Sequence, residues 1–287
     1  FYGSFVWLGV RKKLRFKDVF ILVGITIGGL ILSYPAMLSY DIFNYIITSK
    51  VLFFYQENPY IIMPIEFVGD PFLSFTHAAN KVALYGLIWI LLTGTPYVLG
   101  LGNFIITLFS FKIFIAFFYA ATAILIWMIS KNLISVILFS LNPLVVIETL
   151  ISGHNDIVMI FLALFSFFLL TKKKILLGTL FFALSILIKY ATVFLVPVFL
   201  FMAWKTIRKK DFRLEGIFYY SSLLMFIAFL LSPIREEIYP WYALWFISFS
   251  FLVPNKKMLL YASITFSFGL LFRYVPFMFS GTHAGIS

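Results

Sequence analysis

Three groups of polar side chains interrupt an otherwise apolar chain, and the first group follows the first long apolar run. Asp41 is followed by Asn44 and Tyr45, and residues at i, i+3 and i+4 share one face of a helix. That face would carry a carboxylate, an amide and a phenol. A carboxylate at the depth of lipid headgroups suits general-base catalysis. The alternative is that Asp41 only caps the following helix, because Asp is favoured there.

The second group lies at the end of another apolar run. It combines Glu148 with His154, Asn155 and Asp156, which follow a glycine. Ionisable residues at membrane depth are costly and usually functional, so these residues predict a site; the alternative is a polar turn with Asp156 as the N-cap. One His with unspaced acids is a weak metal pattern. We therefore predict no metal or other cofactor, although a divalent cation could bind.

The third group contains two isolated cations, Lys189 and Arg235, and an aromatic segment that includes Trp241 and Tyr242. Phosphate is a suitable partner, because Arg offers a bidentate fork and Lys a point charge. The alternatives are snorkelling of Lys189 and an ion pair of Arg235 with one of the two glutamates after it. The aromatic rings could stack on sugars or form an ordinary interfacial belt.

The composition indicates the elements that must position these groups. Hydrophobic residues make up 63% of the 287 positions and charged residues 11%, against roughly 45–50% and 25% in soluble domains. This excludes a soluble globule and predicts an all-α integral membrane protein. The net charge of +11 is read as membrane topology and not as nucleic-acid binding, because no basic stripe accompanies polar helices. The absence of Cys excludes disulfides and thiol catalysis.

The basic clusters predict the orientation of the chain. They stand at the ends of apolar runs, at 11–17, 131, 172–174, 205–213 and 256–257, and such clusters stay cytoplasmic. About nine crossings follow, at 19–39, 103–129, 133–150, 157–170, 175–188, 191–204, 216–231, 241–253 and 258–275. Eight of the eleven carboxylates then lie on the outer side.

Residues 82–102 are apolar enough to span, but counting them as a crossing would place the triple lysine at 172–174 outside. We expect an interfacial helix instead, anchored by Tyr85, Trp89 and Tyr97. Residues 40–102 then form one large outer loop with interfacial helices. The chain, 1–287, is expected to be a single transmembrane domain and, since it begins with Phe, a fragment of a longer protein.

The distribution of polar residues bears on the class of function. They gather at one outer interface, whereas transporters carry ionisable residues near the bilayer centre, where only Lys112 qualifies. An enzyme acting on a lipid-borne phosphate at the outer leaflet fits better. Two alternatives stay open: a flippase or other transporter of lipid-linked glycans, which would need polar residues through the midplane, and a glycan ligase, which would share the outer His and cations.

An ordered set of motifs carries a family resemblance. The motifs are Asp41-x-Phe43-Asn44-Tyr45, Asn58-Pro59-Tyr60, Tyr85-Gly86-x-x-Trp89, Asn142-Pro143-x-x-x-x-Glu148, Gly153-His154-Asn155-Asp156, Lys189-Tyr190 and Pro240-Trp241-Tyr242. Together they resemble the GT-C superfamily, and in particular the polyprenyl-phosphate-mannose-dependent mannosyltransferases of bacteria and archaea. The resemblance runs from residue 41 to about 245. The chain departs from many relatives at Leu87, where they have Pro, and Asp41 has no immediate acidic neighbour.

The resemblance implies a GT-C-like bundle with a large first outer loop. It implies inverting transfer of a hexose, above all mannose, from a polyprenyl or dolichyl phosphate to a glycan or glycolipid acceptor, with Asp41 as the general base. The expected partners are this donor, the acceptor and membrane lipids, without nucleic acid. The expected place is the plasma membrane of a bacterium or archaeon, with the active site on the outer face. The expected substrate-binding residues are Asn44, Tyr45, Tyr60, His154, Asn155, Asp156, Lys189, Arg235, Trp241 and Tyr242.

Overall fold

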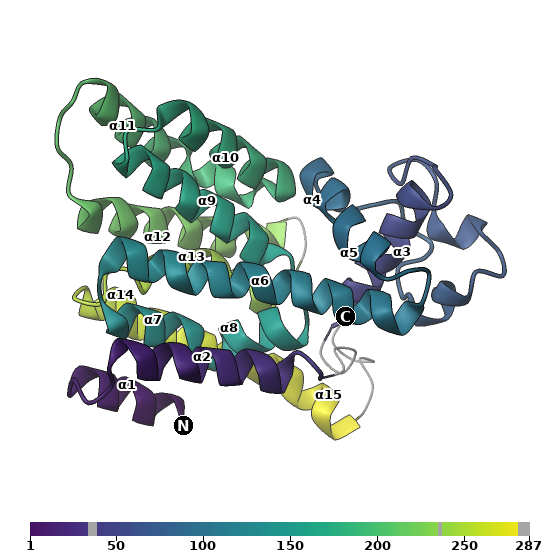
Figure 1. Ribbon diagram of the computed structural model, residues 1–287, viewed down its shortest axis with the longest axis horizontal. Coiled ribbons are helices and arrows are strands. Elements are labelled where there is room, and N and C mark those ends of the chain that lie inside the picture. The colour runs from purple at the N-terminus through teal and green to yellow at the C-terminus, as the bar shows by residue number, and fades with distance from the viewer. Residues whose placement is uncertain (34–38, 235–236, 281–287) are drawn as a thin grey trace.

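The structure is a computed structural model that describes residues 1–33, 39–234 and 237–280. Within these ranges every regular element is a helix, and Figure 1 shows a bundle of roughly parallel axes with a smaller group of helices beyond one end. The bundle consists of α1 (Tyr2–Val10), α2 (Phe16–Leu30), α6 (Phe104–Ser130), α7 (Leu133–Ser140), α8 (Pro143–Val146), α9 (Asp156–Thr171), α10 (Ile175–Ile188), α11 (Val196–Ile207), α12 (Leu214–Leu231), α13 (Leu244–Ser250), α14 (Lys257–Leu271) and α15 (Val275–Ser280).

Three of the described helices are long and apolar enough to cross a membrane. They are Phe104–Ser130, Tyr190–Ile207 and Leu214–Ile234. A bent pair, Leu133–Ser140 with Pro143–Ile151, adds a fourth if it counts as one span. The nine expected crossings go beyond this set, because runs such as those of α9 and α10 form helices of only 16 and 14 residues, and a full crossing takes roughly 20.

The bend of 57° between α7 and α8 follows from the dipeptide Asn142-Pro143. Proline lacks the N–H that would continue α7, but it is well tolerated in the first turn of a helix. The Asn142 side chain accepts hydrogen bonds from the backbone N–H groups of Leu144 at 3.0 Å and Val145 at 3.3 Å, so it caps α8. One π-helical turn, η4 (Ile147–Ile151), follows. The expected crossing 133–150 is therefore a broken helix, with Glu148 in its last turn.

The group beyond the end of the bundle is formed by residues of the segment 40–102, for which we keep the name outer loop. It contains α3 (Asp41–Phe53), η2 (Pro64–Glu66), η3 (Pro71–Phe75), α4 (Leu87–Leu92) and α5 (Gly94–Leu99). A buried ion pair between Lys50 and Asp70 at 2.7 Å, with the Tyr55 hydroxyl donating to Asp70 at 2.7 Å, ties the loop to α3. The apolar stretch 82–102 forms two short helices, which together are shorter than a membrane crossing.

The outer loop is docked on the bundle through Gly86. Its backbone N–H donates to the carbonyl of Ile188 at 3.3 Å. A Cβ at this position would lie 2.1 Å from the carbonyl oxygen of Leu187, so only glycine allows the approach. This contact places the start of α4 against the end of α10, immediately before Lys189.

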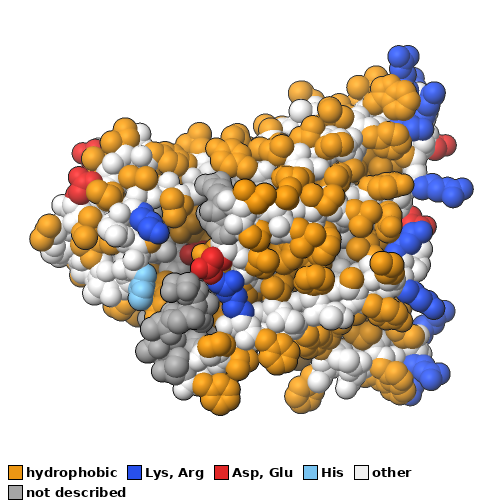
Figure 2. All heavy atoms as spheres, turned by 180° about the vertical axis from the view of Figure 1, so that it is seen from behind, with side chains coloured by type: hydrophobic (Ala, Val, Ile, Leu, Met, Phe, Trp, Pro, Cys, Tyr) orange, Lys and Arg blue, Asp and Glu red, His pale blue; other side chains and the backbone are white. Residues whose placement is uncertain are grey.

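Charge is distributed unevenly over the molecule. Figure 2 shows Lys and Arg side chains along one edge, at the end opposite the outer loop, and apolar side chains over the flank between them. Large apolar residues on the surface of the bundle are exposed, among them Ile113, Phe117, Leu180 and Leu200. An apolar belt bordered on one side by cations is typical of a membrane-spanning bundle, and we conclude that the chain is an integral membrane protein.

Candidate active site

Three ionisable side chains from separate elements meet at the outer-loop end of the bundle. The Oδ2 atom of Asp41, the first residue of α3, lies 3.3 Å from Nδ1 of His154. The Oε2 atom of Glu148, in η4, lies 3.2 Å from Nε2 of the same ring. Neither contact is aligned as a hydrogen bond, so both are close ion-pair contacts. His154 and Glu148 are fully buried, whereas 30% of the Asp41 side chain is exposed.

The surroundings of His154 fix the position of its ring. The ring of Trp241 stacks on it with centroids 3.9 Å apart and planes inclined by 20°. The backbone N–H of His154 donates to the carbonyl of Glu148 at 3.0 Å. The second carboxylate oxygen of Glu148 accepts a hydrogen bond from the Tyr274 hydroxyl at 2.7 Å. The imidazole therefore has little freedom to turn away from Asp41.

The charge of this trio follows from its environment. His154 lies in the turn 152–155, outside the spanning helices. Burial by itself lowers its pKa, but the adjacent carboxylates of Asp41 and Glu148 outweigh burial and raise the pKa from 6.5 to about 9. The ring is thus an imidazolium at neutral pH. The ring faces two carboxylates, and of the three side chains only Asp41 reaches the surface.

A glycine allows the turn to lie against α3. Gly153 has a φ of +75°, and a Cβ there would lie 2.8 Å from the Cδ1 atom of Ile42. Both the left-handed backbone and the close approach favour glycine. A second contact between the turn and α3 is a hydrogen bond from the backbone N–H of Asn155 to the hydroxyl of Tyr45 at 3.4 Å. These contacts hold the turn of His154 on the helix that begins with Asp41.

Tyr45 also joins this turn to the outer loop. Its ring makes edge contacts with Tyr85 and Trp89 at centroid distances of 4.7 and 5.0 Å. Burial raises the pKa of Tyr45 well above its usual value, and the charge of Asp41 adds to the effect, so the hydroxyl stays neutral. The motif that contains Tyr85 and Trp89 therefore supports the back of the site.

A second ionic cluster lies beside the trio. The Nζ atom of Lys189 contacts Oδ1 and Oδ2 of Asp156 at 2.9 and 3.1 Å, and the indole N–H of Trp245 donates to Oδ1 at 2.5 Å. Lys189 also lies 4.5 Å above the ring of Tyr242. Its side chain is 28% exposed. Lys189 is therefore neither a snorkelling residue nor an isolated cation, and its side chain is only partly covered.

An aromatic stack connects the two clusters. Trp241, which stacks on His154, also stacks on Tyr239 with ring centroids 4.5 Å apart. Tyr239 makes an edge contact with Tyr242 at a centroid distance of 5.5 Å. At the outer side of the stack the guanidinium of Arg273 lies 5.3 Å above Tyr239 and pairs with Glu237. The aromatic stack thus has a cation at each end, Lys189 and Arg273.

Other expected site residues take different positions. Asn44 accepts a hydrogen bond from the backbone N–H of Ala78 at 3.4 Å, and the Tyr60 hydroxyl donates to the carbonyl of Tyr85 at 2.8 Å. Both side chains hold the outer loop and make no hydrogen bond or ion pair to the ionic clusters within the described ranges. Arg235, the second expected cation, lies outside the described residues.

Two residues of the site were not expected from the sequence, and a third, Glu148, was expected only as a member of the second polar group without a role of its own. Trp245, on α13, follows Trp241 by four residues, and this helical spacing could have indicated it. Tyr274 is 126 residues from Glu148, and nothing in the sequence connects the two.

The structure also bears on metal binding. In the part of the chain that is described, no group of three or more His, Asp or Glu side chains is placed to hold a metal ion. Each ring nitrogen of His154 instead faces a carboxylate, which leaves no nitrogen free to act as a ligand.

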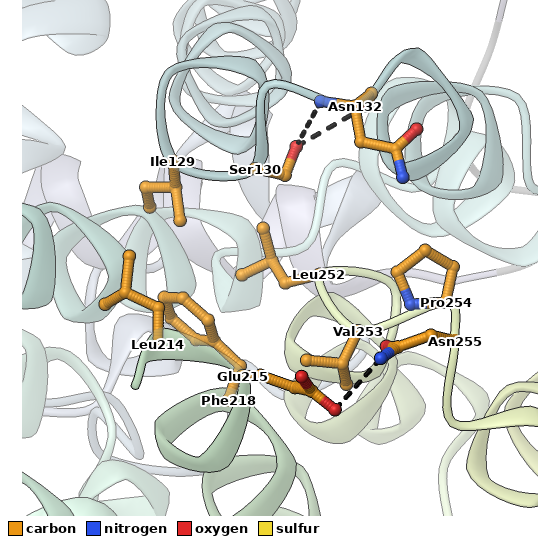
Figure 3. A pocket seen from close by; sticks show the side chains of 10 residues that line it. All are labelled: Ile129, Ser130, Asn132, Leu214, Glu215, Phe218, Leu252, Val253, Pro254 and Asn255. Carbon is orange, nitrogen blue, oxygen red and sulfur yellow. Dashed lines mark hydrogen bonds between the residues drawn. The ribbon is translucent and has the colours of Figure 1, made fainter. Parts of the chain in front are cut away.

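A pocket of about 260 Å³, drawn in Figure 3, is separate from this site. It lies at the basic end, where its wall includes Asn132, Glu215 and Asn255. Glu215 accepts a hydrogen bond from Asn255 at 2.9 Å and pairs with Lys256 at 2.9 Å. Because its carboxylate is already engaged by neighbours, we assign this pocket no chemistry.

Comparison with known proteins gives the reaction class. A family model described as alpha-(1->6)-mannopyranosyltransferase, N-terminal domain, matches residues 5–206, a stretch that includes Asp41, Glu148, His154 and Lys189. No curated protein and no solved structure matches the chain. The match covers more than half of the 287 residues and favours mannosyl transfer to a glycan acceptor over the flippase and ligase alternatives. The chain is a member of the MptA/B family of alpha-(1->6)-mannopyranosyltransferases.

Proposed function

We propose that this enzyme transfers mannose from a polyprenyl- or dolichyl-phosphate donor to a glycan or glycolipid acceptor, with Asp41 as the general base. The observation that carries the proposal is the placement of Asp41. Its carboxylate is partly exposed, lies at the end of the bundle opposite the basic edge, and contacts a fully buried His154 at 3.3 Å. A fixed carboxylate at that depth can reach both a lipid headgroup and an acceptor from outside.

The transfer is a single displacement. The acceptor hydroxyl oxygen attacks the anomeric carbon, the bond from that carbon to the phosphate oxygen breaks, and the electron pair leaves with the polyprenyl phosphate. The hydroxyl proton passes to Asp41. The family forms α linkages, so inversion at the anomeric carbon requires that the donor mannose be β-linked to phosphate.

His154 and Glu148 act through Asp41. The imidazolium contacts the Asp41 carboxylate and orients it, while Glu148 neutralises the imidazolium from its other side. The hydroxyl of Tyr274 holds Glu148 in place. We therefore assign both His154 and Glu148 a positioning role.

Lys189 and the aromatic stack complete the donor site. Lys189, whose side chain is partly exposed, can bind a phosphate oxygen and stabilise the charge that develops on the leaving group. Trp241 stacks on His154 and Tyr239, and Tyr242 is buried beneath Lys189, so these rings support the donor site from behind. Asn155 and Asp156 belong to the same supporting layer. Arg235 remains an expected phosphate ligand.

The membrane arrangement completes the proposal. We place the basic edge in the cytoplasm and the site at the outer face of the plasma membrane of a bacterium or archaeon. The outer loop, 40–102, then lies on the outer leaflet with its two short helices, and the shorter apolar helices contribute to about nine crossings. The positive-inside rule supports this orientation.

The donor is tested with purified enzyme in vesicles. We expect incorporation of label from polyprenyl-phosphate [¹⁴C]mannose and none from nucleotide-activated mannose, with a product that an α-1,6-specific mannosidase releases. The exposed carboxylate Glu57 provides a control, since Glu57→Gln removes an acidic group of the outer loop and should leave transfer unchanged. Transfer from the nucleotide donor alone, or a product that resists the mannosidase, would contradict the proposal.

A further inference from the structure

A groove between α11 and α12 lies apart from the active site. Its volume is about 920 Å³, within the range of roughly 300–1,000 Å³ typical of small-molecule sites. Figure 1 shows the connection between these helices at the end opposite the outer loop. The lining is mostly apolar and includes Phe201, Leu224 and Ile227. Phe201 and Ile227 are each 46% exposed, so the groove faces the surroundings of the bundle.

Two cations stand at one end of this groove. Lys205 is half-buried near the end of α11, with its Nζ atom 5.6 Å above the ring of Phe201. Arg213 is the N-cap residue that precedes α12 and is exposed. Neither forms an ion pair with a carboxylate among the residues that the structure describes. Asp211 also lines this end and is exposed, which leaves one net positive charge.

The dimensions of the groove fit one leaflet of a bilayer. On α12 the lining runs from Gly216 to Ile227, which corresponds to about 16 Å at 1.5 Å per residue. A hydrocarbon core of about 30 Å gives roughly 15 Å for each leaflet. An amphiphile whose head is held at Lys205 and Arg213 would therefore bury about one chain length along the groove.

We propose that this groove binds an anionic phospholipid of the leaflet at the basic edge. Its phosphate lies between Lys205 and Arg213, and an acyl chain packs on Phe201 and Leu224. Basic pockets between membrane helices bind such headgroups. The mannosyl donor is a less suitable occupant, because Lys189, the proposed ligand of its phosphate, lies at the opposite end of the bundle.

The test uses the full chain in nanodiscs that contain equal amounts of phosphatidylglycerol and phosphatidylcholine. Lipids that remain bound after extraction into detergent are counted by native mass spectrometry. We expect the wild type to retain phosphatidylglycerol in preference to phosphatidylcholine. The double variant Lys205→Gln/Arg213→Gln should lose about 10- to 30-fold in affinity for phosphatidylglycerol.

Two further variants make the test specific. Lys172→Gln/Lys173→Gln removes two cations from the same edge, and Lys172 also lies over an aromatic ring, Phe168, at 5.3 Å; this control should retain the lipid. Gly216→Leu fills the groove, because a Cβ at Gly216 meets nothing within 4 Å. It should release the lipid while both cations remain, without lowering the midpoint of thermal unfolding.

Four results would overturn the proposal. They are equal retention of both lipids by the wild type, equal loss in the Lys172 and Lys173 control, retention of phosphatidylglycerol in Gly216→Leu, and displacement of the bound lipid by uncharged polyprenol. A dimer that Gly216→Leu dissociates would show that a second copy of the chain fills the groove, and would equally refute the proposal.

Discussion

Replacing Gly153 by alanine tests whether the close contact between its turn and α3 brings His154 to Asp41. Two effects add. The φ of +75° costs an alanine about 1–2 kcal/mol. The new Cβ would lie 2.8 Å from Ile42 Cδ1, where ordinary contacts begin at 3.4 Å. Overpacking a buried site costs about 1–3 kcal/mol, and the low end applies because only a terminal methyl must move. We expect a loss of about 2–3 kcal/mol in the free energy of unfolding.

Gly153→Ala should also slow mannosyl transfer, by more than its loss of folding stability alone would cause. A turn pushed away from α3 carries His154 away from Asp41, and misplacement of a catalytic constellation by about 1 Å costs up to roughly 10² in rate. The assay measures mannosyl transfer under saturating donor together with the midpoint of thermal unfolding in detergent. We expect kcat to fall about 10- to 100-fold in Gly153→Ala.

Two matched variants separate the causes. Gly102 has a φ of +73°, and a Cβ at this position would meet nothing within 4 Å. Gly102→Ala therefore imposes the same backbone strain without the contact and should keep kcat. Ile42→Val removes the Cδ1 atom and should restore most of the activity to Gly153→Ala. Equal losses of kcat in Gly153→Ala and Gly102→Ala, or no rescue by Ile42→Val, would refute the reasoning.

The remaining predictions concern charge and docking. The pKa of His154, raised to about 9, lies above its unfolded value. The stabilisation of the folded protein by the protonated ring is therefore complete below about pH 6.5 and is lost as the pH rises through 9. Glu148→Gln should move the alkaline limb of the pH–rate profile to lower pH, and an unmoved limb would disprove the assignment. Lys189→Gln should raise the KM for the donor and lower kcat, whereas Lys189→Arg should restore part of both; equal kinetics for the two variants would argue against phosphate binding. Gly86→Ala should lower the thermal midpoint because its Cβ meets backbone oxygens at 2.1 and 2.6 Å, and an unchanged midpoint would contradict the docking.

Much of the helical arrangement could be predicted because long apolar runs end at polar residues. The expected runs 103–129 and 175–188 correspond to α6 (Phe104–Ser130) and α10 (Ile175–Ile188). The run 133–150 forms a helix that is broken between α7 and α8, because the missing N–H of Pro143 outweighs the apolar pattern around it. Proline and the capping Asn142 were both visible in the sequence.

The site could be predicted only in part. Asp41 and His154 were identified by the cost of placing ionisable groups in an apolar chain, and the fold brings them together although they are far apart along the sequence. Their catalytic roles remain proposals. The partner of Lys189 could not be foreseen, because the pairing with Asp156 depends on how α9 and α10 pack. Tyr274 likewise reaches Glu148 only through the packing of the last helices.

The proposed chemistry depends most on Asp41 as the acceptor of the proton. The most direct measurement is the single-turnover rate of Asp41→Asn with saturating donor, together with the Kd of the donor. We predict that the rate falls by about 10² to 10⁴ while the Kd stays close to that of the wild type. A rate equal to that of the wild type, or a loss explained entirely by weaker donor binding, would contradict the central claim.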